Sequence, residues 1–293
     1  MNFLLNGLWY VAFLAAVMIF ASWAKRTNIF MPLYRWIALN VKSKRAVVAI
    51  ISAISGILPI EGRVTVSAGF LDTIAPNDNR KRIYGIIDYL STHHYYFWSP
   101  LEKTVILPMA ILSLSYFDFL FLVWPLIATS LIVGLFYIFF ILREEDIAID
   151  LDKNHKCEQH HHDQPWLQWK VLVAVAGVII LGNFLKSFDT QMYDIVKNNG
   201  SIALATLLSF LFSFAMGSSS KYAGFVSILS TIFGTQYLPL FLAVDYAGYM
   251  LSPSHKCFAV GKMYFDTPIV DFYKAIGFLC SSLILVSLIM ILL

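Results

Sequence analysis

Charged side chains are scarce in this chain of 293 residues, where Asp, Glu, Lys and Arg together make up 13%. Soluble domains usually contain about twice that share. The scarcity is uneven, because residues 2–24, 198–220, 222–244 and 275–293 carry no charged side chain. A transmembrane helix needs about 20 apolar residues. The composition therefore excludes an ordinary soluble domain and predicts an all-α, multi-pass protein of the cell inner (cytoplasmic) membrane.

Cysteine is also scarce, since the chain has only Cys157, Cys257 and Cys280. Three scattered cysteines give neither a disulfide framework nor a paired metal-ligand motif. Residues 155–163 include Cys157 and several histidines, but their spacing fits no tetrahedral zinc site, so we interpret them as a solvated linker. No nucleotide fingerprint, nucleophile elbow or zinc-protease motif occurs. We therefore expect no enzymatic activity, no cofactor, no resident metal and no nucleic-acid partner.

Lys and Arg indicate how the chain is threaded, because basic loops stay on the cytoplasmic side. Basic residues crowd between residues 25 and 45 and again at 80–82, on both sides of the apolar stretch 46–75. We therefore predict that 46–75 is a re-entrant hairpin that enters and leaves the membrane from the cytoplasmic face. Each leg has about 15 residues, which reaches the midplane but does not span.

The same plan is predicted twice along the chain. The first half (1–142) contains the hairpin and three predicted crossings: 3–24, 83–116 and 118–142. After a cytoplasmic linker (143–169), the second half (170–293) contains three crossings and one hairpin: 170–187, 236–263, 268–292 and the hairpin 201–233. Because three crossings are an odd number, the second half starts from the opposite side and lies inverted. Inverted repeats are the plan of many secondary transporters.

One predicted crossing in each half is broken by a Ser-Pro pair, Ser99-Pro100 and Ser252-Pro253. Proline ends a helix, and serine and proline also suit the start of a new one. Ser99 and Glu102 fit the capping-box spacing, so we expect each serine to cap a second half-helix. The N-terminal end of such a half-helix near the midplane attracts anions, and the preceding carbonyl groups attract cations.

The two hairpin tips and the two breaks carry most of the intramembrane charge. Such charge is costly in lipid and is usually functional. Four cations face two carboxylates here, which favours an anionic solute. The residues predicted to bind it are Glu61, Gly62, Arg63, Ser99, Glu102, Lys103, Ser218, Ser219, Ser220, Lys221, Ser252, Ser254, His255 and Lys256.

Each of these signals also has a purely structural interpretation. In this interpretation Glu102 only caps its helix and pairs with Lys103. Glu61 and Arg63 then form an internal salt bridge that stabilises the hairpin. The lysines at the breaks have an interfacial role if they extend toward the headgroups. The three tip serines serve close helix packing if no ion binds them. Asp88 and Asp245, which precede the breaks, are either coupling-ion ligands or helix-surface or interface residues.

Three stretches resemble an uncharacterised prokaryotic integral membrane family, domain of unknown function 401. They are GILPIEGRVTVSAGFLD (56–72), RIYGIIDYLSTHHYYFWSPLEKTVIL (82–107) and YAGYMLSPSHKCFAVGKMYF (246–265). The resemblance implies the ion transporter superfamily, with paired hairpins, a moving transport domain and a homodimeric scaffold. It points to residues 61–63, 99–100 and 252–256. The chain departs from the family pattern at Arg63, where a small residue is usual.

These observations together predict a secondary transporter that moves a small anionic, carboxylate-bearing solute by elevator-like alternating access. Cations at both hairpin tips would repel Na⁺, so we expect sodium-independent transport by proton coupling or exchange. The alternative is a membrane-embedded lipid-handling protein or enzyme that acts on a phosphate-bearing lipid head group. The predicted partners are the anionic solute, membrane lipid and a second copy of the chain.

Overall fold

The computed structural model describes residues 30–57, 63–100, 102–147, 201–216 and 223–292, together with isolated positions in 12–23 and 173–177. Within these ranges every regular element is a helix, as the composition predicts. Most of the predicted spans 3–24 and 170–187, and most of the linker 143–169, lie outside the described residues.

The first three described helices are α2 (Phe30–Asn40), α3 (Lys44–Ile57) and α4 (Arg63–Ile74), of which α3 and α4 pack against each other. Lys44 Nζ and Arg45 Nε, at the start of α3, donate to the carbonyls of Ile147 and Leu142 at 2.9 Å. The Tyr84 hydroxyl lies 3.4 Å from the carbonyl of Ile74 and 3.1 Å from that of Asp146. The start of α3 and the end of α4 therefore lie at the same end of the molecule.

The next helix is interrupted at the predicted place. α5 (Arg82–Thr92) leads into the short 3-10 helix η2 (His94–Phe97), and α6 (Lys103–Leu112) follows after Ser99-Pro100. α7 (Tyr116–Phe136) begins with a capping box between Ser115 and Asp118 and continues into the π-helical turn η3 (Tyr137–Ile141). The chain between 82 and 112 thus forms two helical segments separated by a break.

The second half contains the helices α10 (Ile202–Met216), α11 (Ala223–Phe233), α12 (Leu238–Leu251), α13 (Lys256–Phe265) and α14 (Ile269–Leu292). The predicted interruption at Ser252-Pro253 separates α12 from α13. Short 3-10 helices lie in the connections, namely η1 (Asn79–Lys81), η4 (Glu144–Asp146) and η6 (Thr235–Tyr237).

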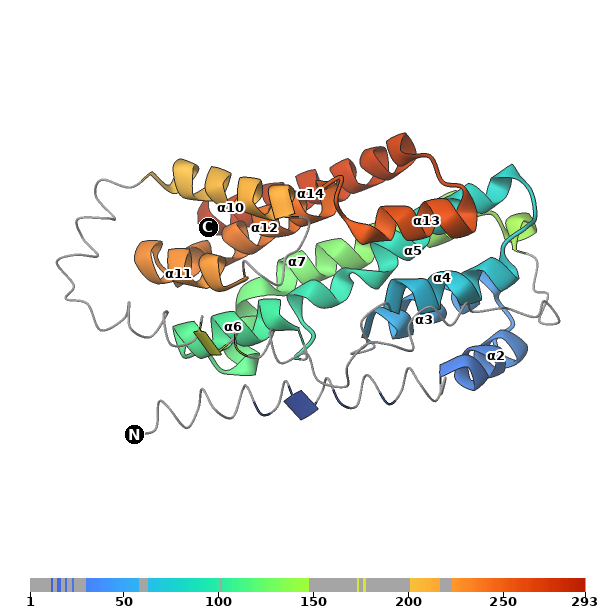
Figure 1. The fold of residues 1–293 in the computed structure, drawn as a ribbon, viewed down its shortest axis with the longest axis horizontal. Helices are drawn as coiled ribbons and strands as arrows, with labels where there is room; N and C mark the ends of the chain where they lie inside the picture. Colours follow the sequence, from blue (N-terminus) through green and yellow to red (C-terminus); the bar gives the residue numbers. More distant parts are fainter. Residues whose placement is uncertain are drawn as a thin grey trace.

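Two helix pairs flank the interrupted helices. The pair α3–α4 packs against α5 and, through α4, against α13, whereas the pair α10–α11 packs against α12 and, through α11, against α6. Each pair thus contacts the first segment of the interrupted helix from its own half and the second segment of the other. Figure 1 shows α3, α4 and α13 toward one end of the long axis and α6, α10 and α11 toward the other. The long helices α7 and α14 pack against each other.

The buried apolar side chains form two clusters. The larger one joins α5, α7, α12 and α14 and includes Phe119, Phe241 and Leu283, each 0% exposed. The smaller one joins α2, α3 and α4 to the start of α5 and includes Tyr34 and Val48. The interrupted helix that begins with α5 contributes to both clusters and so connects the two parts of the molecule.

Two helices are long and apolar enough to cross a membrane, Tyr116–Ile141 and Ile269–Leu292. At 1.5 Å per residue they measure about 39 and 36 Å, against about 30 Å for the hydrocarbon core of a bilayer. In each of them only a third of the most apolar window is buried inside the protein. Phe117, Phe121 and Phe140 expose 79%, 81% and 77% of their surface. By length and composition these two helices are candidates for membrane spans.

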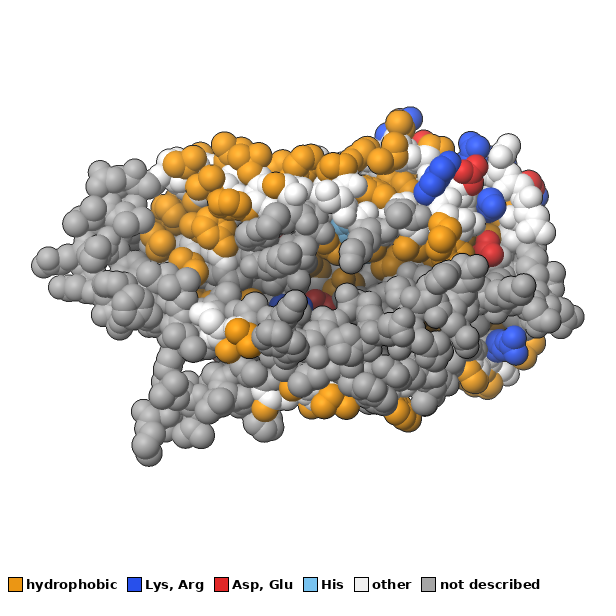
Figure 2. Space-filling view, viewed as in Figure 1, with side chains coloured by type: hydrophobic (Ala, Val, Ile, Leu, Met, Phe, Trp, Pro, Cys, Tyr) orange, Lys and Arg blue, Asp and Glu red, His pale blue; other side chains and the backbone are white. Residues whose placement is uncertain are grey.

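Charged side chains gather at one end of the molecule in the view of Figure 2, over the region of η1 and the end of α13. The exposed charges there include Arg80, Lys262 and Asp266. The surface over α10 and α11, toward the other end, is predominantly apolar in the same view. An apolar flank beside a charged end is the distribution expected of a protein whose end reaches the membrane surface.

Candidate functional site

Both interruptions contain the same kind of turn. The Glu102 N–H donates to the carbonyl of Ser99, and the His255 N–H donates to the carbonyl of Ser252, each at 3.0 Å. Proline occupies the second position of each four-residue turn, where its fixed φ is favourable. The two breaks therefore share the same turn hydrogen bond although they lie in different halves of the chain.

The expectation that each serine caps the following half-helix is wrong. α6 begins at Lys103 after Glu102, and α13 begins at Lys256 after His255. Glu102 and His255 are the N-cap residues, both in extended conformation, and neither side chain makes a capping hydrogen bond. The reason is that Glu102 and His255 are in extended conformation, which interrupts the backbone between each serine turn and the helix that follows.

A lysine is thus the first residue of each second half-helix, Lys103 in α6 and Lys256 in α13. The first N–H groups of a helix have no intrahelical acceptor, and this end carries partial positive charge. A cation at this end adds to that charge, so an anion is the favourable occupant. The side chains of Glu102 and Lys103 are partly buried, and the Lys256 side chain lies outside the described part of the chain.

The segments that approach the two breaks are in direct contact. The Tyr89 hydroxyl of α5 donates to the carbonyl of Met250 near the end of α12, at 2.9 Å. Tyr96 and Tyr249 each stand three residues before the serine of their break, and their rings stack with centroids 6.4 Å apart. Tyr249 also packs on His255, with ring centroids 4.2 Å apart. The interrupted helices therefore meet at their interruptions.

Each first half-helix carries a buried carboxyl group near the break. Asp245 of α12 is 0% exposed and accepts hydrogen bonds from the hydroxyls of Tyr96 and Ser213. Asp88 of α5 is 2% exposed, and its Oδ1 has no hydrogen-bond partner among the described residues. Burying a carboxyl group is costly unless hydrogen bonds compensate for the lost water. Tyr96 belongs to the other half of the chain, so the hydrogen bond to Asp245 ties the two interrupted helices together.

The ends of α3 and α10 that lead to the predicted hairpin tips lie close to the breaks. A Cβ atom on Gly56, near the end of α3, would stand 2.8 Å from Nε2 of His94 in η2. A Cβ atom on Gly248 of α12 would stand 2.4 Å from the carbonyl oxygen of Phe210 in α10. At Gly248 the obstructing atom belongs to the backbone, so only glycine fits there, whereas at Gly56 the nearest atom is the end of the His94 side chain. The two helix pairs therefore approach the breaks with backbone nearly in contact.

The predicted solute-binding residues fall into two groups. Those at the breaks are described: Ser99 (2% exposed), Ser252 (0%) and His255 (2%) are buried, Glu102 and Lys103 are partly buried, and Ser254 is exposed. Those at the tips lie outside the described residues: Glu61, Gly62, Ser218, Ser219, Ser220 and Lys221, together with the side chain of Arg63. The structure therefore describes most of the break residues, and the role of both groups in binding stays a prediction.

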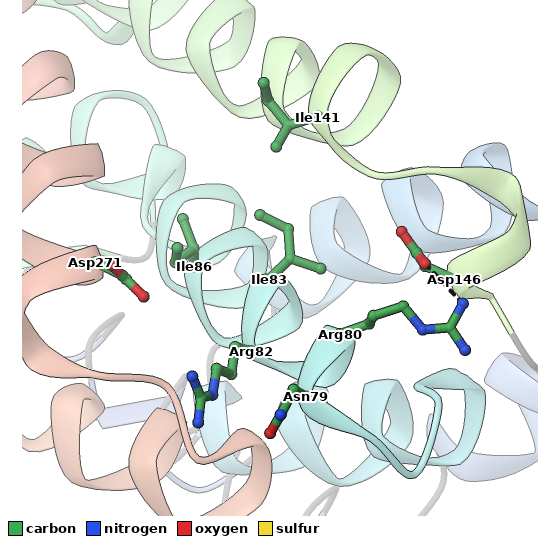
Figure 3. Close-up of a pocket in the computed structure, with 8 residues that line it drawn as sticks. All are labelled: Asn79, Arg80, Arg82, Ile83, Ile86, Ile141, Asp146 and Asp271. Atoms are coloured by element: carbon green, nitrogen blue, oxygen red, sulfur yellow. Dashed lines mark hydrogen bonds and ion pairs between the residues drawn. The ribbon is translucent and has the colours of Figure 1, made fainter.

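A surface hollow of about 320 Å³ lies away from the breaks, at the charged end of the molecule (Figure 3). Arg80 and Arg82 contribute to its lining, but Arg80 already pairs with Asp78 at 2.7 Å and with Asp146 at 3.1 Å. The hydrogen bonds from Arg80 hold the pKa of the exposed Asp78 carboxyl below its usual value. Because carboxylates neutralise its principal cation, we do not take this hollow as the anion site.

Comparison with known proteins bears on the second half of the chain. Residues 169–293 match the family described as "Protein of unknown function (DUF401)". No curated protein and no solved structure matches the chain. The DUF401 match contains the whole stretch 246–265, which includes the second break and α13, so it supports the resemblance there. The resemblance of 56–72 and 82–107 to the same family stays a prediction.

The site contains residues that the sequence did not single out as binding residues. Outside the DUF401 match they are Tyr89, His93 and Tyr96, and within it they are Ser213, Tyr249 and Cys257. The equivalent spacing of Tyr96 and Tyr249, three residues before each serine, was visible in the sequence and is the one signal that pointed to a paired role.

Proposed function

We propose that this protein is a multi-pass protein of the cell inner membrane. The exposed apolar surfaces of α7 and α14 support this assignment, because burying apolar surface in lipid is favourable by about 25 cal/mol per Å² and exposing it to water is not. The charged end in Figure 2, with basic residues in the 42–45 and 80–82 stretches, suits the cytoplasmic membrane surface.

We propose further that the two halves are inverted repeats, each with a re-entrant hairpin. The reciprocal packing supports this: α3–α4 contacts α5 and α13, and α10–α11 contacts α12 and α6. An exchange of the two halves by a two-fold axis in the membrane plane would produce this pattern. The convergence of Lys44, Arg45 and Tyr84 on residues 142–147 supports a first hairpin that returns to the face from which it enters.

On this architecture we propose a secondary transporter for a small anionic, carboxylate-bearing solute. The observation that carries the proposal is the meeting of two broken helices, each of which resumes with a lysine after a Ser-Pro turn. Helix N-termini with an added cation form a local site for a carboxylate group. Irregular backbone at membrane depth is tolerated where protein, water or a ligand satisfies it.

The residues at the breaks would have distinct roles. Lys103 and Lys256 would attract the solute anion, and the turn residues Ser99 and Ser252 would fix the half-helix ends around it. The hairpin-tip residues 61–63 and 218–221 would close the site from either side during alternating access. The pair α7 and α14 would form the fixed scaffold and the dimer contact, while the hairpins and interrupted helices move together as an elevator.

Uptake by the purified protein in liposomes tests this function. We expect uptake from a panel of mono-, di- and tricarboxylates, and we expect Lys103→Met and Lys256→Met to weaken solute affinity by roughly 30-fold or more. This factor follows from about 2–5 kcal/mol for losing one partner of a desolvated charge pair. The matched control is Lys262→Met, because Lys262 pairs with Asp266 at the surface of α13.

Four outcomes would contradict parts of the proposal. Unchanged affinity in both lysine variants would reduce the lysines to structural roles. Binding of phosphate-bearing lipid without uptake of any carboxylate would favour the lipid-handling alternative. Uptake that requires an inward Na⁺ gradient and survives collapse of the proton gradient would exclude sodium-independent coupling. A monomeric mass in detergent would contradict the expected homodimer.

A further inference from the structure

Three metal-ligating side chains converge beside the second break. We propose that His93, His255 and Cys257 form a binding site for a thiophilic metal ion, Zn²⁺ or Cu⁺. One ligand atom from each of the three residues lies within 4.8 Å of the other two. His93 follows α5, His255 is the N-cap of α13 and Cys257 lies in its first turn, so the cluster joins segments 164 residues apart.

Both imidazole rings are oriented as metal ligands usually are. Nδ1 of His93 lies 2.7 Å from the Tyr89 carbonyl oxygen, and Nδ1 of His255 lies 3.0 Å from the Tyr249 carbonyl oxygen. A carbonyl oxygen only accepts hydrogen bonds, so each Nδ1 carries the proton and donates it. Each Nε2 then keeps its lone pair. Donation of the second ring N–H to a backbone carbonyl is the arrangement that orients histidine ligands in metal sites.

The unpartnered nitrogen of His255 is an independent sign of a ligand. His255 is 2% exposed, and its Nε2 has no hydrogen-bond partner among the described residues. A buried polar atom without a partner costs about 1–3 kcal/mol, so native structures rarely keep one without a reason. A metal ion at the centre of the cluster would accept the lone pair and remove this cost.

The spacing of the ligand atoms also fits a metal ion. Nε2 of His93 lies 3.6 Å from Sγ of Cys257. For tetrahedral zinc, with Zn–N of about 2.0–2.1 Å and Zn–S of about 2.3 Å, the same two atoms stand about 3.6 Å apart, and two nitrogens stand about 3.4 Å apart. The remaining separations, at most 4.8 Å, would therefore close by no more than about 1.4 Å on binding.

The donor set selects the kind of ion. Two imidazole nitrogens and one thiolate suit zinc and copper, whereas Mg²⁺, Ca²⁺ and Na⁺ prefer oxygen ligands. Tyr89, Tyr249 and Phe258 surround the His255 ring, with centroids 5.0, 4.2 and 5.9 Å away, so the shell is aromatic. Three protein ligands leave the fourth position of a tetrahedral ion open to water or to an anion. The ion would also fasten α5 to α13 at the break.

Cobalt binding to the metal-free full-length protein in detergent tests the site without any transport assay. Co²⁺ stands in for Zn²⁺ and gives a thiolate-to-cobalt charge-transfer band in the near ultraviolet. We expect this band to appear on addition of Co²⁺. Zn²⁺ should displace Co²⁺ and remove the band, Cu⁺ should compete with Co²⁺ for the site, and Mg²⁺ should have no effect. Cys257→Ser should abolish the band. His93→Gln and His255→Gln should weaken binding by at least the roughly 10–100-fold that loss of an outer-shell partner costs.

Two cysteine variants are matched controls. Cys280→Ser changes a buried cysteine of α14 outside the cluster, and Cys157→Ser changes the cysteine beside the histidines of residues 155–163. Both should keep the band. A band that survives Cys257→Ser or disappears in Cys157→Ser would overturn the proposal and place the metal elsewhere. If protein that elutes as a single species binds neither Co²⁺ nor Cu⁺, the proposal is wrong. Cys257 and His93 then form only an S–H···N hydrogen bond.

Discussion

The hydrogen bond from Tyr96 to Asp245 offers a direct test of how the two halves are held together. Asp245 is fully buried in α12, and its two hydroxyl donors are Tyr96 and Ser213. Tyr96→Phe removes one donor and keeps the ring. A hydrogen bond contributes about 0.5–1.5 kcal/mol, or about 1.5–3 kcal/mol when one partner is charged. We therefore expect Tyr96→Phe to lower the free energy of unfolding by about 1–3 kcal/mol.

Tyr246 provides a matched control for this substitution. It is the residue after Asp245, it is 0% exposed, and its ring packs on that of Tyr96 with centroids 5.0 Å apart. Its hydroxyl has no hydrogen-bond partner among the described residues. Tyr246→Phe removes a buried polar atom that makes no bond, so we expect unchanged or increased stability. The two Tyr→Phe changes are chemically identical. Their expected effects on the free energy of unfolding differ in sign or by at least about 1 kcal/mol.

Unfolding of the purified variants in detergent, followed by tryptophan fluorescence, measures both effects. At roughly 2–4 °C per kcal/mol, Tyr96→Phe should lower the midpoint by about 2–12 °C, and Tyr246→Phe should not lower it. Equal destabilisation by the two variants would refute this reasoning, because the loss of stability would then come from changed ring packing and not from the lost hydrogen bond to Asp245. A more stable Tyr96→Phe would show that the bond to Asp245 does not compensate for burying the Tyr96 hydroxyl.

Two further predictions concern packing and orientation. Gly248→Ala should lower the free energy of unfolding by about 1–3 kcal/mol, because its Cβ would stand 2.4 Å from a backbone carbonyl of α10. The Cβ of Gly277→Ala in α14 meets nothing within 4 Å, so this variant should raise the free energy of unfolding by up to about 1 kcal/mol. Equal effects of the two variants in thermal unfolding would contradict this. Single cysteines at positions 44 and 80 should react with an impermeant maleimide from the same side of the membrane. Reaction from opposite sides would make 46–75 a crossing and end the inverted-repeat argument.

The sequence alone predicted the all-helical class and the places where two of the helices are interrupted. Low charge and long apolar runs predict helices, because only helices and closed barrels satisfy their backbone groups in lipid. Ser99-Pro100 and Ser252-Pro253 predicted the breaks, because proline acts on its own neighbours in the chain. The start of the second half-helices was predicted wrongly at the serines, since the extended conformation of Glu102 and His255 delays each helix until Lys103 and Lys256.

The tertiary structure decided which of these residues meet. Tyr96 binds Asp245 across 149 positions, and His93 lies beside Cys257 across 164. No local sequence pattern predicts pairs that are so far apart in the chain. In a soluble helix the polar face marks the side turned away from the core, but helices such as α7 and α14 are apolar on all faces. Since lipid and protein interior favour the same side chains, the sequence does not mark the face along which two such helices pack. The contact between α5 and α13, which places His93 beside His255 and Cys257, is likewise a result of the tertiary structure.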